Sequence, residues 1–263
     1  MERHLGFQDF MSLFRFKRRF DGYVGIERER FLMASDGLCI PRSAEFLALI
    51  RDARWTYELS ACQVEDRTRP QKDLSAIKLE LLENDNNGHG VGAKLGLRLV
   101  HQEVADRDMP LNVYPDPRSL RIASEISKEQ LRAACRVTGT HLHFGTRSMK
   151  HAIALHNALV PHVEELCRLG DHSNGERIKI YKIMATNWKP LMYEGPQHFY
   201  ARAQDQGFAE NPRNCWHLIR ISTHGTVELR MFGVTDHIDE VLSWISHVRT
   251  IVAHTIEIPG GAL

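Results

Sequence analysis

The stretch Tyr23-Val-Gly-Ile-Glu-Arg-Glu-Arg-Phe-Leu-Met33 predicts a β-strand over residues 22–33. Alternate residues of a strand point to the same face of its sheet, so Glu27 and Glu29 project together. Arg28 and Arg30 place charge on the opposite face too, which an amphipathic surface strand, the alternative interpretation, would not show. Carboxylates crowded on one wall repel each other unless protons, cations or metal ions compensate them. The strand therefore predicts a cation-binding wall.

A segment near the C-terminus repeats this geometry. Thr226-Val-Glu-Leu-Arg230 places Glu228 and Arg230 on one face and apolar side chains on the other. Arg220 would come beside them through a turn at residues 223–225. A ladder of surface salt bridges is the alternative interpretation. The arginines suggest an anionic ligand held beside the carboxylates.

We predict one strand over residues 57–64, which contains Glu58 and is followed directly by Glu65. Residues seven apart face opposite sides of a regular strand, so these two would converge only through a bulge or a turn. Their spacing leaves their role open. Cys62 lies between them and could contact the site, but a nucleophilic role is not favoured.

Two histidines lie within Gly139-Thr-His-Leu-His-Phe-Gly145. His141 and His143 share one face of the predicted strand, and the flanking glycines leave room for a ligand or another backbone. A zinc-binding pair like that of amidohydrolase barrels would need an early position and a repeating βα pattern, and the chain has neither. A pair of core histidines is the other interpretation.

Composition and element order set the class of protein. The chain has 263 residues, 43% hydrophobic and 25% charged, with a net charge of +1, which is ordinary for one soluble domain spanning 1–263. This balance favours neither nucleic acid nor membranes as partners, and we interpret the basic cluster Arg15–Arg19 as a solvated face or a local anion contact. The scattered cysteines predict a reduced, cytoplasmic protein. Homo-oligomerisation stays open.

The periodicity predicts an α+β fold with an antiparallel sheet and helices packed on one side, because hairpin signals occur without any glycine-rich phosphate loop. Further strands are expected over residues 95–101, 137–144 and 217–232, and helices over 43–54, 73–83, 128–136, 149–169 and 237–254. Asn84–Gly90 is expected to break the second helix because of its Asn/Gly content. Oxygen-rich clusters suit magnesium or manganese, which bring nucleotide phosphates with them.

Four segments together resemble the glutamate–cysteine ligase family, in particular its type 2 carboxylate–amine ligase branch. They are Gly25-Ile-Glu-Arg-Glu-Arg-Phe31, Glu58 with Gln63-Val-Glu65, Gly139–Gly145, and Trp216-His-Leu-Ile-Arg220 with Gly225-Thr-Val-Glu-Leu-Arg230. The resemblance covers about residues 22–250, and glutamine synthetases share the His-x-His strand. It implies a glutamine-synthetase-like catalytic domain, with a curved antiparallel sheet that forms a metal-lined funnel and helices behind it.

The resemblance also implies ATP-dependent amide or peptide-bond formation through an acyl phosphate. It implies that two or three magnesium ions are bound by Glu27, Glu29, Glu58, Glu65, His141 and Glu228. His143 would lie near the γ-phosphate or the substrate carboxylate, and Arg220 and Arg230 would bind ATP and neutralise the transferred phosphoryl group.

The stretch 170–215 departs from the family, and the substrates would be recognised there. Arg177 and Lys179 are candidates for phosphate or carboxylate contacts, and Asn84–Gly90 and residues 106–118 are candidate lids. The substrates are expected to be a small carboxylate and an amine, with amino acids favoured. A phosphotransferase of guanidino-kinase type, a non-catalytic nucleotide-binding domain and an unrelated metal-dependent hydrolase are the alternatives.

Overall fold

The predicted first strand lies near the middle of a seven-stranded antiparallel sheet in the computed structural model, which describes residues 5–255. The strands are β1 (Val24–Met33), β2 (Trp55–Tyr57), β3 (Gln63–Arg67), β4 (Arg98–Val100), β5 (Thr140–Gly145), β6 (Ile219–Ser222) and β7 (Thr226–Phe232). Their order is β2-β3-β1-β5-β7-β6, and β4 also pairs with β1. Phe31 pairs with Gln63 of β3 and with Val100 of β4, so β4 continues the edge of β1 that β5 also uses.

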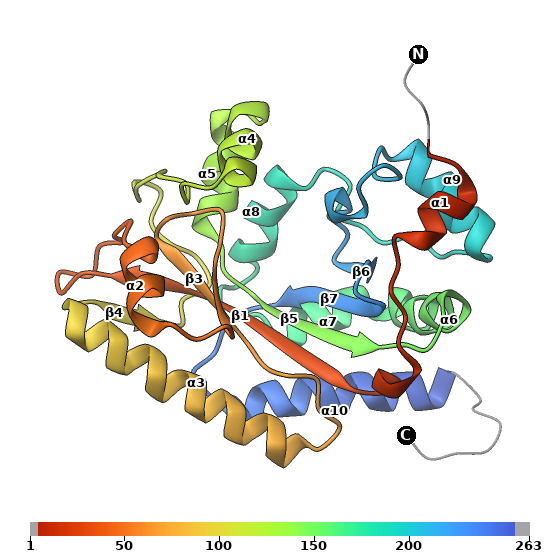
Figure 1. The fold of residues 1–263 in the computed structure, drawn as a ribbon, viewed down its shortest axis with the longest axis horizontal. Coiled ribbons are helices and arrows are strands. Elements are labelled where there is room, and N and C mark those ends of the chain that lie inside the picture. Colours follow the sequence, from red (N-terminus) through yellow and green to blue (C-terminus); the bar gives the residue numbers. More distant parts are fainter. Residues whose placement is uncertain (1–4, 256–263) are drawn as a thin grey trace.

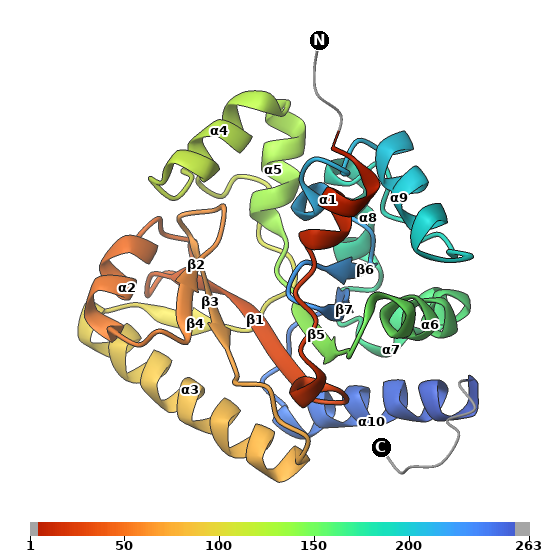
Figure 2. The ribbon, with the colours of Figure 1, turned by 45° about the vertical axis from the view of Figure 1, so that its right-hand side comes forward.

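Helices cover one face of this sheet and surround part of the other (Figure 1). The α-helices are α1 (Phe7–Ser12), α2 (Ser43–Ile50), α3 (Leu74–Leu95), α4 (Pro117–Glu125), α5 (Lys128–Arg136), α6 (Met149–Leu159), α7 (Val163–Leu169), α8 (Glu176–Met184), α9 (Pro196–Asp205) and α10 (Ile238–Thr255). Short 3₁₀ helices are η1 (Arg18–Phe20), η2 (Val160–His162) and η3 (Pro212–Asn214). Helices α3 and α10 run along one face, whereas α4, α5 and α8 rise on the other (Figure 2). The α+β prediction is confirmed, but helices are not confined to one side.

The main core lies between the sheet and the helices α6 and α10. Ile26, Leu142 and Leu229 come from three neighbouring strands and are buried against this layer. Trp244 of α10 is also fully buried, and its ring stacks on Phe232 with a centroid distance of 5.0 Å. Burial of such apolar area, at about 25 cal/mol per Å², fixes this face of β1, β5 and β7. Because strand side chains alternate, the other face of the same strands is directed toward α4, α5 and α8.

The prediction of one strand over residues 57–64 is wrong, because the chain reverses direction between β2 and β3. Thr56 pairs with Glu65 in the antiparallel register of β2 and β3. The turn is held by the Gln63 amide, which donates to the Ser60 carbonyl at 3.0 Å. A reversal of this kind is one of the two ways in which Glu58 and Glu65 were expected to converge.

The predicted break at Asn84–Gly90 is also wrong, because α3 continues through it to Leu95. Asn84 is buried and donates to Asp66, and Gly88 lies so close to Trp55 that a Cβ there would approach the indole to 2.6 Å. These tertiary contacts override the low helix propensity of asparagine and glycine. The segment is therefore not a mobile lid.

Other expectations hold approximately. The helix predicted over residues 149–169 is divided into α6, η2 and α7 around Pro161, whose ring cannot continue an α-helix. Residues 112–114 of the other lid candidate are hydrogen-bonded to residues 59–61, with the Ala61 amide donating to the Asn112 carbonyl at 2.8 Å. Helices α1, α4, α8 and α9 were not predicted. Within residues 5–255, no helix is both long and apolar enough to cross a membrane.

Candidate active site

The cross-strand register brings the predicted residues of the strands into one row on the face of the sheet that is directed toward α4, α5 and α8. We call this face the open face, and the face that packs on α3 and α10 the closed face. Glu27 of β1 pairs with His141 of β5, and Glu29 pairs with Glu65 of β3. On the other side, His143 pairs with Glu228 of β7, which in turn pairs with Arg220 of β6. Residues that pair directly across strands point to the same face. The candidate ligands from β1, β3, β5 and β7 therefore form a continuous wall.

A β-bulge lies in this row, between β5 and β7. Thr140 pairs with Phe232 and Leu142 with Leu229, so Arg230 and Met231 together oppose the single residue between Thr140 and Leu142. A bulge of this kind bends its strand and redirects the side chains beside it. The bulge lies at Arg230, directly next to the carboxylate of Glu228.

Three groups of side chains in this wall are close enough to share a metal ion. They are Glu27 with His143 and Glu228, Glu27 with Glu65 and His141, and Glu29 with Glu58 and Glu65, and in each group the ligand atoms lie within 4.8 Å of one another. Glu27 and Glu65 each belong to two groups, so the three positions adjoin. Carboxylates with a few imidazoles suit hard divalent ions such as Mg²⁺ and Mn²⁺. The donor set therefore fits the expected metals.

The carboxylates of Glu29, Glu58 and Glu65 at the β3 end of the wall lie close together, and Glu65 has one cationic partner, Arg67, whose Nε lies 3.6 Å away. Burial raises the pKa of Glu65 well above its ordinary value, and the nearby charges of Glu27 and Glu58 raise it further. Burial likewise raises the pKa of Glu29 and of Glu58. A cation in this position would relieve the repulsion, because an opposite charge stabilises the ionised forms.

Two histidines sit between the carboxylates. His141 is buried, with its Nδ1 3.6 Å from Glu27 and its Nε2 3.6 Å from Glu29, and burial lowers its pKa. Its Nδ1 has no hydrogen-bond partner in residues 5–255, which leaves that atom available as a ligand. His143 Nε2 lies 3.0 Å from Glu27. Burial would raise the pKa of Glu27, but His143 and His141 hold it well below its usual range.

At the opposite end of the wall, Glu228 is paired with two arginines. The Arg220 guanidinium donates to both carboxylate oxygens, at 2.8 and 2.9 Å, and Arg230 donates to one of them at 2.5 Å. Burial would raise the pKa of Glu228, but these two guanidiniums hold it well below its usual range. Glu228 therefore belongs to one candidate metal group and also pairs with two arginines that line the same cavity.

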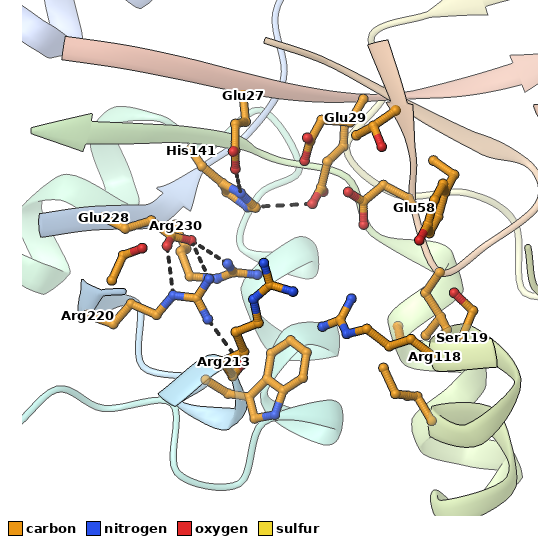
Figure 3. Close-up of a pocket in the computed structure, with 18 of the residues that line it drawn as sticks. Glu27, Glu29, Glu58, Arg118, Ser119, His141, Arg213, Arg220, Glu228 and Arg230 are labelled. Atoms are coloured by element: carbon orange, nitrogen blue, oxygen red, sulfur yellow. Dashed lines mark hydrogen bonds and ion pairs between the residues drawn. The ribbon is translucent and has the colours of Figure 1, made fainter. Parts of the chain in front are cut away.

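The wall lines a cavity of about 360 Å³. Figure 3 shows Glu27, Glu29 and Glu58 along one side of it, with Arg118 of α4 and Arg213 of η3 pointing toward them from the other side. Neither guanidinium has an ion pair within the part of the chain that the structure describes. The sequence analysis missed both residues, since an exposed arginine in a loop or at a helix start carries no periodic signal. It also missed Arg67, although Arg67 follows Glu65 at the same-face spacing.

The structure does not bring three other candidate residues into the cavity. Arg177 is buried elsewhere, and its guanidinium donates to the backbone carbonyls of Thr138, Arg230 and Met231 at 2.5 to 3.0 Å. Lys179 is exposed on α8 and does not line the cavity. Cys62 is fully buried in an apolar cluster and does not line it either.

The comparisons with known proteins concern the fold. No protein-family model matches the sequence, and no curated protein matches it. Among solved structures, a bifunctional glutathione synthetase from Pasteurella multocida superposes with a TM-score of 0.60 at 12% identity, over 95% of this chain and 40% of that one. The chain thus spans less than half the length of that enzyme.

Two further structures give lower scores. Apo GmaS has a TM-score of 0.49 at 16% identity, over 92% of this chain and 56% of that one. A novel glutamine synthase homolog has a TM-score of 0.48 at 13% identity, over 97% of this chain and 61% of that one. These two TM-scores lie below 0.5, so the shared fold is argued from the glutathione synthetase match, at 0.60. The chain has the fold of part of that glutathione synthetase.

Proposed function

We propose that the protein is an ATP- and magnesium-dependent carboxylate–amine ligase of the glutamate–cysteine ligase type. One observation carries the proposal: three adjoining groups of metal ligands face a set of guanidiniums within a single cavity. Phosphoryl transfer needs chiefly positioning and charge neutralisation, which such an arrangement supplies without a glycine-rich phosphate loop. The ligase fold of the bifunctional glutathione synthetase supports the same class of reaction.

In the proposed reaction, an oxygen of the substrate carboxylate attacks the γ-phosphorus of ATP. A new O–P bond forms, the bond to the β-phosphate oxygen breaks, and ADP leaves. The amine nitrogen then attacks the carbonyl carbon of the acyl phosphate, so a C–N bond forms, the C–O bond to phosphate breaks, and phosphate and one proton are released. This sequence yields one amide, one ADP and one phosphate for each ATP.

The residues of the wall would have two roles in this reaction, metal binding and stabilisation of the phosphoryl charge. Glu27, Glu29, Glu58, Glu65, Glu228 and His141 would hold two or three Mg²⁺ ions, or Mn²⁺, and these ions would neutralise the phosphate oxygens. Arg220 and Arg230, already fixed by Glu228, would stabilise the charge on the transferred phosphoryl group. His143, between Glu27 and Thr226, would orient the donor carboxylate or γ-phosphate.

A phosphotransferase on the same fold is the second candidate, because the same wall and arginines would serve transfer to a carboxyl or guanidino group. A coupled ADP-release assay against pools of amino acids and amines separates the two. A ligase releases ADP and phosphate only when both an acid and an amine are present. Release with one substrate alone, together with a phosphorylated product in the mass spectrum, would identify a phosphotransferase. Absence of Mg-ATP binding by calorimetry would remove both candidates.

A further inference from the structure

The turn between β6 and β7 places one more imidazole at the main cavity, and the proposed metal binding does not use it. Thr223, His224 and Gly225 form this turn. His224 lines the main cavity and also a second cavity of about 280 Å³ that opens beside it. The turn was expected from the sequence, but His224 was not among the candidate site residues.

Hydrogen bonds on both sides hold this turn in place. The Thr223 carbonyl accepts from the Arg15 amide at 2.9 Å. The Gly225 carbonyl accepts from the amide and the hydroxyl of Thr146, at 3.0 and 2.9 Å. Gly225 has φ of +78°, and a Cβ there would lie 2.5 Å from the Arg15 carbonyl oxygen, so only glycine allows the turn to pack this closely on the N-terminal segment. His224, between two anchored residues, is positioned by the fold.

The turn lies at the end of the wall where the acyl phosphate is proposed to form. Ser222 and Thr226, which flank the turn, pair with each other in the register of β6 and β7. The Thr226 hydroxyl lies 3.2 Å from Nδ1 of His143, the residue proposed to orient the donor carboxylate or the γ-phosphate. A substrate held at His143 would therefore lie beside the turn that carries His224.

The ring of His224 differs from those of the two histidines in the wall. His141 has both ring nitrogens 3.6 Å from a wall carboxylate, and His143 has one at 3.0 Å. Neither ring nitrogen of His224 has a hydrogen-bond partner, or a carboxylate oxygen within 4.0 Å, in the part of the chain that the structure describes. The side chain of His224 is also exposed, so a substrate amine can reach it.

The surrounding charges favour the neutral form of this ring. The charged and titratable groups around it are Glu27 of β1, His143 of β5, Arg213 of η3 and Glu228 of β7, and the second cavity adds Arg15 and Glu210. Partial burial lowers the pKa of His224 below its ordinary value of about 6.5, and the neighbouring cations lower it further against the two carboxylates. The ring is therefore mainly neutral at pH 7, with one nitrogen able to accept a proton.

The amine step of the proposed reaction needs such a proton acceptor. Amines are largely protonated at pH 7, since α-amino groups have a pKa of about 8 and alkylammonium groups of about 10. A protonated nitrogen has no lone pair with which to attack the acyl phosphate. The wall carboxylates are assigned to metal ions or paired with arginines, and His141 is a candidate metal ligand. The acceptor is therefore expected outside the wall.

We propose that His224 is the general base of the amine step. Its unprotonated ring nitrogen takes one proton from the substrate ammonium, and the freed lone pair attacks the carbonyl carbon of the acyl phosphate. The C–N bond forms, the C–O bond to phosphate breaks, and a second proton from the nitrogen leaves with the phosphate as hydrogen phosphate. The imidazolium then releases its proton to solvent. This inference rests on the proposed ligase function and adds the residue that activates the second substrate.

The test compares nucleophiles that need a base with one that does not. The standard amino acids, methylamine and ammonia serve as amines, and hydroxylamine, which is largely unprotonated at pH 7, serves as the other nucleophile, each with pooled carboxylic acids and Mg-ATP. His224→Gln should lower kcat for amide formation by about 10²-fold and hydroxamate formation by less than about threefold, because a general base typically contributes about 10²–10⁴-fold. Added imidazole should restore part of the amide formation in His224→Ala. His237→Gln, 80% exposed and outside both cavities, is the matched control.

Two further readouts follow the ionisation of His224 itself. Amide formation by the wild type should fall as the pH drops below about 6.5, because the ring takes up its own proton, and His224→Gln should lack this fall. In NMR spectra of the free protein, the Cε1–H signal that His224→Gln lacks should titrate below about pH 6.5. Titration above about pH 7 would overturn the inference, because the ring would then be protonated before it meets the amine.

The outcomes separate this inference from the proposed function. Equal losses of amide and hydroxamate formation in His224→Gln would overturn the inference and leave the ligase intact, because His224 would then not act on the amine proton. Unchanged amide formation in His224→Gln would do the same. If the wild type releases no ADP with any of these acids and amines, the ligase function is overturned, and the inference with it.

Discussion

The two faces of β1 carry alternating charges of opposite sign and compensate them in different ways. On the closed face, Arg28 and Arg30 are fully buried and share Asp66 and Asp85, at distances of 2.5 to 2.9 Å. On the open face, Glu27 and Glu29 meet mainly histidines and other carboxylates. The closed face balances these charges within the chain, whereas the open face brings Glu29, Glu58 and Glu65 within 4.8 Å of one another.

This difference separates residues that maintain the fold from residues that we propose to bind metal, although all four are charged and adjacent in sequence. A buried ion pair contributes little net stability while it is intact, but its loss is strongly destabilising because a buried charge is left alone. A cluster of carboxylates on a cavity wall behaves in the opposite way, since removing one member relieves repulsion. Substitutions on the closed face should therefore lower the free energy of unfolding. Substitutions of carboxylates on the open face should lower activity and leave the free energy of unfolding of the metal-free protein unchanged or raised.

The largest effect on stability is expected from Asp66→Asn on the closed face. The change leaves Arg28 and Arg30 buried with one shared carboxylate fewer, so the free energy of unfolding should fall by about 3–5 kcal/mol. Urea denaturation followed by circular dichroism measures it, with the exposed Asp108→Asn as control. A fall below about 1 kcal/mol would show that the network does not hold the face together.

On the open face, Glu29→Gln should abolish most activity and leave the fold intact. Loss of one ligand from the metal wall should lower kcat by at least about 10²–10³-fold, the order found when one charge-stabilising group is removed. ADP release measures the effect, and Glu45→Gln on the exposed face of α2 is the control. Full activity in Glu29→Gln would remove Glu29 from the site.

Divalent cations should stabilise the open face specifically. Mg²⁺ or Mn²⁺ at a hundred times its Kd should raise the free energy of unfolding by about 2.7 kcal/mol, because it binds the folded state alone. Thermal unfolding in MgCl₂ and in NaCl of equal ionic strength measures the increment. Asp66→Asn should keep this increment, and Glu65→Gln, which removes a ligand shared by two groups, should lose it. If the stabilisation by the divalent cation is the same in Glu65→Gln as in the wild type, Glu65 is not a metal ligand.

The smallest expected effect is a difference in pH dependence between the faces. Burial would raise the pKa of Asp66, but Arg28 and Arg30 lower it below its ordinary value, so its stabilising contribution is present above about pH 3.9 and lost as the pH falls further. The pKa of Glu65 is raised, so its contribution is present below about pH 4.3 and lost as the pH rises.

Glu65→Gln should therefore stabilise the metal-free protein at pH 7 by on the order of 1 kcal/mol and change little near pH 4. Denaturation curves at the two pH values in EDTA measure the difference. Destabilisation at pH 7 would mean that the ion pair with Arg67, at 3.6 Å, outweighs the repulsion of the Glu65 carboxylate by its neighbours.

Strand periodicity was sufficient to predict the parts of the site that lie on regular strands. The pairs Glu27 with Glu29 and His141 with His143 needed only the alternation of side chains, and the register then brought them together. Glu58 could not be placed, because its position depends on a chain reversal for which the sequence shows no Asn-Gly or Asp-Gly signal.

Long-range contacts explain the failures. Asn84 appears unfavourable for a helix until its partner Asp66, eighteen residues away, is known. Arg28 and Arg30 were recognised as unusual, but their burial depends on Asp85 of α3, which no local pattern connects to β1. Arg118 lies at the start of α4 and Arg213 in η3, two elements that the sequence analysis did not predict. Resemblance identified the candidate metal ligands, whereas the arginines opposite them became evident only from the structure.

Arg177 has a consequence for how this sequence can vary. Its guanidinium joins the carbonyl of Thr138, before β5, to those of Arg230 and Met231 at the bulge in β7. A lysine has one ammonium in place of a planar fork and could not reach all three carbonyls together. An exchange usually regarded as conservative would therefore release the bulge and displace Arg230. Among homologous sequences, position 177 should therefore vary as little as the candidate metal ligands, although Arg177 does not line the cavity.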